Sequence, residues 1–380
     1  EDHGTHVAGT ISAVNNNGKG VCGVAGGDSK KGVKGAKLMS CQIFDGEKQG
    51  SATEAIKWSA DHGAVISQNS WGYTEVTTAP SSLKSAVDYF IKNAGCDKNG
   101  KQRSDSPMKG GIVIFAAGNE NQNFSSSDYD GMVSVSSVGA DYKRAYYTNY
   151  GSWCDVAAPG GDAKKGNQVL STLPGNKYGK MQGTSMACPH VSGVAALGLS
   201  YMKKLGKTCT KDEFKSMLLT SVNDMNAQCL GIKQTCLYAA NYAIGPLSLS
   251  KYRGKMGTGS IDAWKFLMNI EGTPCLTAVV GLEQAVSLES IFGGSYSSLK
   301  YLGVDISDED YRALDLAAMP EIKAGRLVIC PKKSGNVKIT INAVAGGQTP
   351  GNGENMGGLT ISKTVSLVAR GVSSENGGWL

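Results

Sequence analysis

The chain has 380 residues and a formal net charge of +6, with 41% hydrophobic and 18% charged residues. At about 100–200 residues per domain this length predicts two domains, and the composition excludes an intrinsically disordered chain. The mild positive charge gives no reason to expect a nucleic acid partner, and no apolar run reaches the roughly 18–20 residues of a transmembrane helix. The 51 glycines, well above the usual share of about 7%, follow no collagen-like period and indicate many tight turns.

The first 270 residues alternate short apolar runs with helical patterns. The apolar runs predict strands at residues 36–44, 64–68, 111–117, 132–138 and 154–157. The helical patterns cover residues 52–62, 81–94, 185–205 and 210–222, and the last opens with Thr210 and Glu213 at the spacing of a capping box. Strands that alternate with helices predict an α/β domain, doubly wound around a mostly parallel sheet that is covered on both faces.

The composition changes after about residue 271. Short β-rich runs, punctuated by Gly, Ser, Pro and Asn, follow at 326–330, 337–344 and 359–368. A glycine- and asparagine-rich loop is expected at 346–358. The predicted division is therefore a first domain at 1–271 and a small β-sandwich domain at 272–380.

The ten cysteines form no C-x-x-C pair, which disfavours a zinc ribbon. Cys209, Cys229 and Cys236 cluster in a polar stretch that has room for one disulfide bridge. The cysteines by themselves leave the redox compartment undecided.

Ser185 stands at a turn that leads into an apolar helix, in the segment 183–193 (GTSMACPHVSG). A serine at a helix N-terminus faces unpaired N–H groups and the positive end of the helix dipole. This position suits a nucleophile whose attack creates an oxyanion. The alternative is an ordinary N-cap serine, which is a common role for serine.

Two histidines stand near the start of the chain, in the segment 3–10 (HGTHVAGT). A histidine is the usual base for a serine nucleophile because its pKa lies near neutrality, and His3 is the candidate. The pair His3 and His6 also has the spacing of metal ligands, but no third ligand is near, so no metal is expected. The alternative for His6, as for His190, is a hydrogen-bonded packing residue.

Asn119 follows an apolar strand in the segment 116–119 (AAGN). Its amide can donate a hydrogen bond to a developing oxyanion. The alternative is a turn residue with left-handed backbone geometry, which asparagine tolerates.

Taken together, the three segments resemble the histidine, oxyanion and serine motifs of the subtilisin-like serine proteases, the subtilase family. Asn149-Tyr150-Gly151 and the segment 156–160 resemble further motifs of that family, and the resemblance covers about residues 1–271 in the family's order. It implies a doubly wound α/β fold and peptide hydrolysis through an acyl-enzyme, with a polypeptide substrate and no cofactor. The G-x-S-x-G setting of a lipase-like hydrolase does not occur around Ser185.

The resemblance also assigns roles to individual residues. Ser185 is then the nucleophile, His3 the general base and Asn119 the oxyanion donor. The residues implied to bind substrate are Ser70, Trp71, Gly72, Ala117 and Gly118. Trp71 shapes a hydrophobic pocket or, alternatively, is a core residue. Because no acidic cluster flanks residues 70–72, strict specificity for basic side chains is disfavoured.

The family's catalytic aspartate precedes its histidine in the chain, whereas here the histidine motif begins at residue 3. Asp2 adjoins His3, but a neighbour in sequence rarely reaches Nδ1 of the ring, and Asp28, Asp45 and Asp305 lack the Asp-Ser/Thr-Gly setting of that residue. We expect the aspartate and its strand to lie in a cleaved or truncated N-terminal segment. Loss of this aspartate lowers kcat by about 3 × 10⁴ in a subtilisin, so weak activity or none is expected for this chain alone.

The alternative function is that of a pseudo-protease, which binds extended peptides without cutting them. The presence of His3, Asn119 and Ser185 favours an active endopeptidase, since a binding module needs none of them. By analogy with the family, the protein is expected to be secreted or held in the cell envelope.

Overall fold

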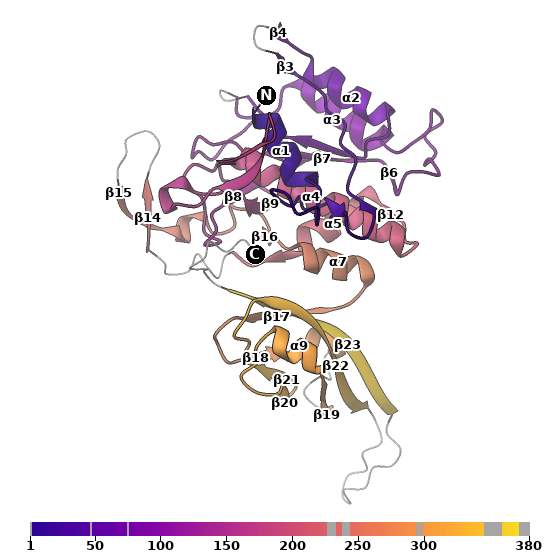
Figure 1. Ribbon diagram of the computed structural model, residues 1–380, viewed down its shortest axis with the longest axis vertical. Coiled ribbons are helices and arrows are strands. Elements are labelled where there is room, and N and C mark those ends of the chain that lie inside the picture. Colours follow the sequence, from indigo (N-terminus) through magenta and orange to yellow (C-terminus); the bar gives the residue numbers. More distant parts are fainter. Residues whose placement is uncertain are drawn as a thin grey trace, which may run out of the picture. The chain divides into compact units, whose positions relative to one another are not determined.

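A six-stranded sheet lies at the centre of the first part of the chain, as the computed structural model shows (Figure 1). Its strands, in spatial order, are β13 (Val222–Asn223), β16 (Ser260–Ile261), β9 (Val156–Pro159), β8 (Met132–Val138), β7 (Ile112–Ala116) and β5 (Ile66–Asn69). Neighbouring strands from β5 to β16 run parallel, and β13 joins β16 antiparallel. The prediction of an α/β fold with a mostly parallel sheet is confirmed.

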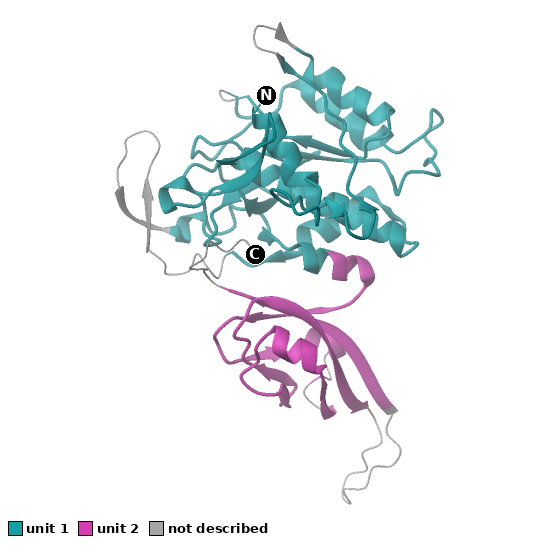
Figure 2. Cartoon of the chain, viewed as in Figure 1, with its two compact units in different colours: residues 1–266, 375–380 teal, residues 267–374 magenta. Residues whose placement is uncertain are grey.

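The structure describes residues 2–45, 48–73, 76–225, 233–237, 244–293, 296, 299–345 and 359–371. The chain forms two compact units, residues 1–266 with 375–380 and residues 267–374 (Figure 2). Helix α7 (Ala263–Glu271) begins in the first unit and ends in the second. Of the helices that the structure describes, none has both the length and the apolar character needed to span a bilayer.

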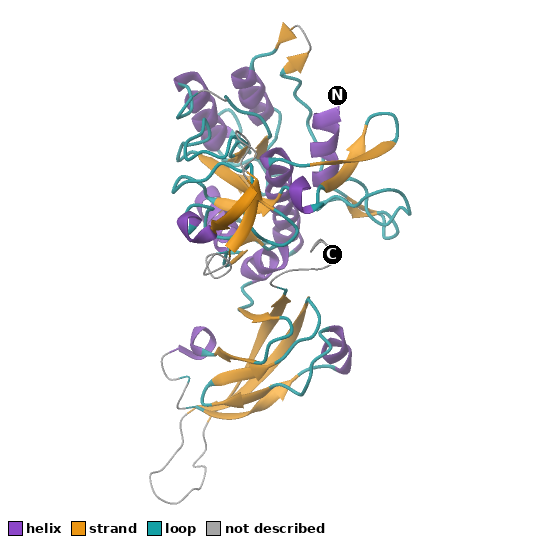
Figure 3. Cartoon of the chain, turned by 90° about the vertical axis from the view of Figure 1, so that its left-hand side faces the viewer, coloured by secondary structure: helices purple, strands orange, loops and turns teal. Residues whose placement is uncertain are grey.

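Helices cover the central sheet on both sides, so that neither face of its middle strands meets solvent (Figure 3). Every residue of β7 and β8 is buried. Among the described residues, the helices that lie wholly in this unit are α1 (Asp2–Ser12), α2 (Ala52–Asp61), α3 (Ser81–Asn93), α4 (Thr184–Lys204) and α5 (Lys211–Thr220), with short 3₁₀ turns at Ala163–Lys165 and Leu249–Tyr252. Helix α4 contacts β5, β7, β8 and β9, while α3 contacts β7 and pairs with α2. One core cluster joins Phe115 of β7 to Leu83 and Phe90 of α3.

Short two-stranded sheets surround the central one. They are β1 (Gly27–Asp28) with β2 (Val33–Lys34), β3 (Phe44–Asp45) with β4 (Lys48–Gln49), β6 (Met108–Lys109) with β12 (Cys209–Thr210), β10 (Val169–Leu173) with β11 (Lys177–Met181), and β14 (Lys233–Leu237) with β15 (Ile244–Ser248). Helix α1 packs against both α4 and β10. Gly9 makes this contact possible, because a Cβ atom there would lie 2.2 Å from Thr172 Oγ1.

Most predicted elements of this unit are confirmed within two residues at each end. The capping box is present as well, since Thr210 accepts from the Glu213 backbone and Glu213 accepts from the Thr210 backbone. The sequence pattern did not indicate the β10–β11 hairpin. The described cysteine side chains, that of Cys209 included, are free thiols. Cys229 lies outside the described residues, and only the backbone of Cys236 is described, so the predicted bridge stays a prediction.

The predicted strand at 36–44 is wrong. It is a strand only at its end, where Phe44 begins the short hairpin of β3 and β4. An apolar run becomes a strand only when a neighbour completes its hydrogen-bond ladder, and no described strand runs beside residues 37–43. Leu38 and Met39 are accordingly 49% and 40% exposed.

The second unit is a β-sandwich, as predicted. One sheet has the order β17 (Cys275–Val279), β23 (Leu359–Arg370), β22 (Gly335–Ala345), β19 (Lys300–Asp305), and the other β18 (Gln284–Ser287), β21 (Arg326–Ile329), β20 (Glu321–Lys323). Two short helices, α8 (Glu289–Phe292) and α9 (Asp308–Ala313), complete it. Leu367 and Ile339 of the first sheet share a core with Leu327 of the second. The loop expected at 346–358 lies outside the described residues.

Candidate active site

Ser185 is the second residue of α4. The N-cap of this helix is Gly183, which has a φ of 150° and makes no side-chain capping bond, so the alternative that Ser185 is itself the N-cap is wrong. The first N–H groups of a helix have no partner within the helix and lie at the positive end of its dipole. The half-buried Ser185 therefore holds its hydroxyl where developing negative charge is stabilised.

Two hydrogen bonds join Ser185 to the carboxyl end of β5. Its Oγ donates to the carbonyl oxygen of Ser70 at 3.3 Å, and Ser70 Oγ donates to the carbonyl oxygen of Ser185 at 2.8 Å. Gln68 supports this pair, because its Nε2 donates to Ser70 Oγ at 2.6 Å. Ser70 thus touches the candidate nucleophile directly, as its place after a parallel strand suggested.

Asn119 follows the carboxyl end of β7 and turns its side chain toward the start of α4. Its Oδ1 accepts from the Thr184 backbone N–H at 2.8 Å and from Thr184 Oγ1 at 3.0 Å. The hydroxyl of Thr184 in turn accepts from the Gly118 N–H at 3.1 Å. Because Thr184 holds the amide oxygen, the nitrogen Nδ2 is the atom that Asn119 offers to a ligand. Its φ is not among the positive values, so the alternative of a left-handed turn residue is wrong for Asn119 itself.

A cavity of about 140 Å³ lies between these segments. Its wall includes five residues expected to act on or bind substrate, namely Ser185, Asn119, Trp71, Gly72 and Gly118. Ala117 does not contribute its side chain, because it is fully buried and both of its backbone polar groups are bonded, to Val135 and Asn149. Nucleophile, amide donor and a recess for a side chain therefore meet at one place.

Trp71 serves both of the roles considered for it. It lines the cavity and also packs against the buried cluster of α2, α3 and β7. Its ring meets that of Phe115 edge to face at 5.2 Å, and its Nε1 donates to Asn69 Oδ1 at 3.1 Å. The indole is therefore held rigidly at the cavity wall.

Several residues of the cavity wall were not anticipated. They include Tyr73, Glu120, Ser126, Asn149 and Thr184. Glu120 places a carboxylate in this wall. Thr184, next to the nucleophile, had a signal in the sequence, whereas Ser126 comes from a loop that no motif singled out.

His3 lies on an exposed part of α1. It shares a helix face with Val7, four residues on, and Val7 clusters with Met186, the neighbour of Ser185. The packing of α1 on α4 therefore brings the helix of the candidate base beside that of the candidate nucleophile. Asp2 precedes His3 in the same helix and is exposed.

The other two histidines of the motifs are packing residues. His6 is fully buried, and its Nε2 faces the carbonyl oxygens of Val169 at 3.0 Å and Gly179 at 3.2 Å. Burial lowers the pKa of His6 below its ordinary value of 6.5, and it lowers the pKa of His190 in the same way. Among the described residues, no group of three potential metal ligands comes together.

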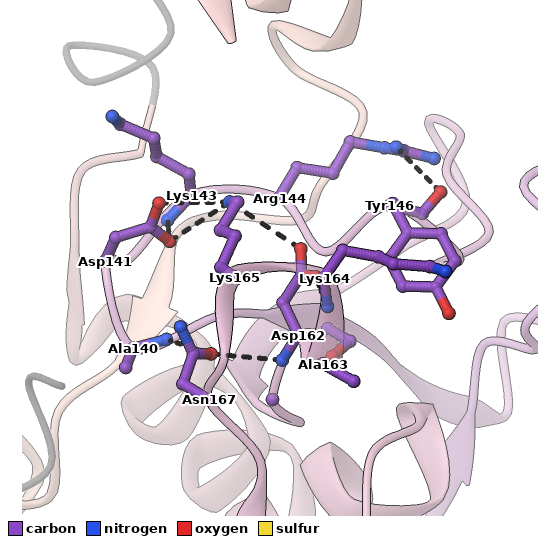
Figure 4. A network of polar contacts seen from close by, with 12 residues as sticks. Ala140, Asp141, Lys143, Arg144, Tyr146, Asp162, Ala163, Lys164, Lys165 and Asn167 are labelled. Carbon is purple, nitrogen blue, oxygen red and sulfur yellow. Dashed lines mark hydrogen bonds and ion pairs between the residues drawn. The ribbon is translucent and has the colours of Figure 1, made fainter. Parts of the chain in front are cut away.

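A salt-bridged loop supports the start of α4. Lys165 Nζ lies 3.0 Å from the carboxylate of Asp141 and 3.7 Å from that of Asp162 (Figure 4). Burial raises the pKa of Asp162, and the nearby Lys165 opposes this rise. The same loop binds the N-cap of α4, because the Gly183 N–H donates to the Gly160 carbonyl at 3.0 Å. The network thereby steadies the turn that presents Ser185.

Known proteins resemble this chain in sequence. Relatives include the extracellular basic protease of Dichelobacter nodosus, 36% identical over 238 residues, which are 60% of this chain and 36% of that protein. The thermophilic serine proteinase of Bacillus sp. (strain AK1) is 34% identical over 201 residues, which are 52% of this chain and 42% of that protein. The chain thus spans less than half the length of these two relatives.

Solved structures agree in fold. A protease from Pseudoalteromonas arctica PAMC 21717 aligns with a TM-score of 0.50 and 30% identity over 70% of each chain. The prenylagaramide maturation protease PagA aligns with a TM-score of 0.51 and 22% identity over 71% of this chain and 83% of that one. A sequence model of the subtilase family matches residues 1–237, and the chain belongs to that family.

Proposed function

We propose that this protein is a serine endopeptidase in which Ser185 is the nucleophile, His3 the general base and Asn119 an oxyanion donor. The observation that carries the proposal is the double hydrogen bond from Thr184 to Asn119 Oδ1. It holds the Asn119 amide beside the first turn of α4, on the same cavity wall as Ser185. A module that only binds peptides has no need of an oriented amide next to a serine at a helix N-terminus.

In the proposed reaction, Ser185 Oγ attacks the carbonyl carbon of the scissile peptide bond while His3 takes the hydroxyl proton. Asn119 Nδ2 and the Ser185 N–H donate to the oxyanion of the tetrahedral intermediate. His3 then gives its proton to the leaving amine, and the C–N bond breaks to leave an acyl-enzyme. Water, activated by His3, attacks the ester, and the product acid leaves as Ser185 recovers its proton.

We further propose that the carboxylate partner of His3 comes from a segment of the protein outside this sequence, its cleaved N-terminal segment being one candidate. Strand β5 ends the central sheet, and its outer edge carries no ladder among the described residues. The segment 37–43 has the pattern of a strand but pairs with no described strand. A parallel strand on β5 would bring its carboxyl end to the edge where Ser70 meets Ser185.

The remaining parts of the proposal concern the whole protein. Its substrate is a polypeptide, and residues 1–271 act as the catalytic domain with 272–380 as an accessory domain. Secretion or attachment to the cell envelope is supported by the name of one relative, an extracellular protease.

The test compares the 380-residue chain with a longer chain that includes the residues naturally preceding it. Both are assayed on a chromogenic peptide substrate, each with its Ser185→Ala variant as control. The longer chain is expected to be faster by up to the roughly 3 × 10⁴ in kcat that the aspartate contributes in a subtilisin, and S185A to abolish the difference. A longer chain that binds the peptide but does not cleave it would favour a pseudo-protease instead.

A further inference from the structure

The side chain of Asn149 spans the loop that carries Asn119. Asn149 is 1% exposed, and its Oδ1 accepts from the backbone N–H groups of Glu120 at 3.0 Å and Gln122 at 3.1 Å. Its Nδ2 donates to the carbonyl oxygen of Ala117 at 3.0 Å. One amide thus binds the backbone two residues before Asn119 and also one and three residues after it.

We call these side-chain hydrogen bonds the Asn149 clamp, and backbone hydrogen bonds reinforce it. The Asn149 N–H donates to the carbonyl oxygen of Gly118 at 3.0 Å. On either side of it, Asn121 N donates to Tyr147 O at 2.8 Å, and Tyr150 N donates to the carbonyl oxygen of residue 122 at 3.0 Å. The segment 147–150 is therefore hydrogen-bonded to the loop that carries Asn119, from residue 118 to residue 122.

At Gly118 the two segments pack too closely to admit a side chain. Gly118 has a φ of +100°, and a Cβ atom there would lie 2.3 Å from Asn149 Nδ2. The same nitrogen also donates to the carboxylate of Glu120 at 2.7 Å. The backbone of Asn149 is not left-handed, so its conformation does not require an asparagine. The hydrogen bonds of the side chain require an asparagine, because it accepts two of them and donates at least two.

The buried Arg144 holds the residues that flank Asn149. Its side chain is 1% exposed, and its guanidinium donates to Thr148 O at 2.7 Å and to the side chain of Asn121. The guanidinium carbon lies 4.2 Å from the ring centroid of Tyr252 and 5.1 Å from that of Tyr150. The residues on both sides of Asn149 are thereby held in place.

We propose that Asn149 is a positioning residue for the oxyanion hole, which acts through Asn119 and does not touch the substrate's reacting atoms. This inference rests on the proposed function. An oxyanion donor stabilises the transition state only when it is already at the position that the oxyanion will occupy. A displacement of about 1 Å is enough to cost catalysis heavily. The Asn149 clamp, together with the bonds from Thr184 to Asn119, supplies that fixed position.

The experiment is a double-mutant cycle on the active, complete protein, with Asn149→Ala, Asn119→Ala and the double variant. We expect N149A to lower kcat by about tenfold or more, less than the roughly 10²–10³ measured for loss of the asparagine donor in a subtilisin, with KM changed less than about twofold. In the N119A background, the same change should lower kcat by less than about twofold, because the residue through which Asn149 acts is gone.

Asn93→Ala is the control, since Asn93 is only half-buried but its side chain also donates to a backbone carbonyl, that of Tyr89, at 2.8 Å. It should leave kcat unchanged. Hydrogen exchange gives a readout independent of activity: N149A should lose protection at the amides of Glu120 and Gln122, and N93A should not.

The outcomes separate this inference from the proposed function. A complete wild-type protein without activity refutes the proposed function, and the role of Asn149 with it. An active wild type whose N149A variant keeps full kcat refutes the inference alone. An equal loss of kcat with and without Asn119 also refutes it, because Asn149 would then act on the fold in general.

Discussion

Asn119 and Thr184 are joined by two hydrogen bonds to one atom, since Asn119 Oδ1 accepts from both the backbone amide and the hydroxyl of Thr184. Thr184 is fully buried and directly precedes Ser185. The residue that orients the candidate oxyanion donor is therefore fixed to the candidate nucleophile by a single peptide bond. Any shift of the first turn of α4 moves both groups together.

Replacing Thr184 by Val tests this coupling. The change keeps the shape of the side chain but removes one bond to Asn119 and the acceptor of the Gly118 N–H. A neutral hydrogen bond contributes about 0.5–1.5 kcal/mol, which corresponds to a fall in kcat of about two- to tenfold. Steady-state kinetics on the complete protein should show this fall for T184V and near-normal kcat for Thr184→Ser. Equal kcat for T184V and wild type would show that the hydroxyl orients nothing.

The burial of His6 predicts a loss of stability in acid. The folded protein holds the pKa of His6 below 6.5, so between that folded pKa and 6.5 the unfolded chain binds more protons than the folded one. Stability then falls as the pH drops below about 6.5, by at most about 1.4 kcal/mol per pH unit from this group.

Urea unfolding at pH 7.5 and pH 5.0 measures this loss for the wild type and for His6→Gln. Glutamine can still donate to the Val169 carbonyl but does not titrate, so H6Q should lose less stability between the two pH values. The same loss in both proteins would mean that other groups, such as His190, account for the effect.

Two glycines of α1 allow a paired test of how this helix packs. A Cβ atom at Gly9 would lie 2.2 Å from Thr172 Oγ1, whereas at Gly4 it would meet nothing within 4 Å. Gly9→Ala should therefore lower the free energy of unfolding by about 1–3 kcal/mol. Gly4→Ala should raise it by up to about 1 kcal/mol, because alanine favours a helix. Thermal denaturation that ranks G4A at or below G9A would contradict the packing of α1 on β10.

Much of the fold follows from local pattern. The buried runs of β7 and β8 and the capping box at Thr210 are local signals, and the structure places these elements where they predict. The segment 36–43 shows the limit of such reasoning, because its apolar pattern suits a strand but a ladder needs a neighbour. The β10–β11 hairpin was missed because most of its residues are exposed or half-buried, so its sequence lacks an apolar run. Pairing of the two strands and the packing of β10 on α1 hold it.

The candidate site was predictable where a motif carried its chemistry, as at Ser185 and Asn119. The residues that orient those groups lack such a signal. Asn149 was noticed as part of a motif, but its contacts with residues 117–122 arise from tertiary pairing and became visible only in the fold. Ala117 shows that a place in a motif does not decide whether a side chain reaches the cavity, since its side chain is fully buried.

The proposed mechanism requires Ser185 to be an activated nucleophile. Its most direct test is to treat the complete protein with a fluorophosphonate that reacts with activated serines, and to locate the adduct by peptide mass spectrometry. We expect one adduct per molecule, on Ser185, with its rate of formation greatly reduced in His3→Ala and with no adduct in Ser185→Ala. A complete, folded protein that remains unlabelled at Ser185, or that is labelled equally well without His3, would contradict it.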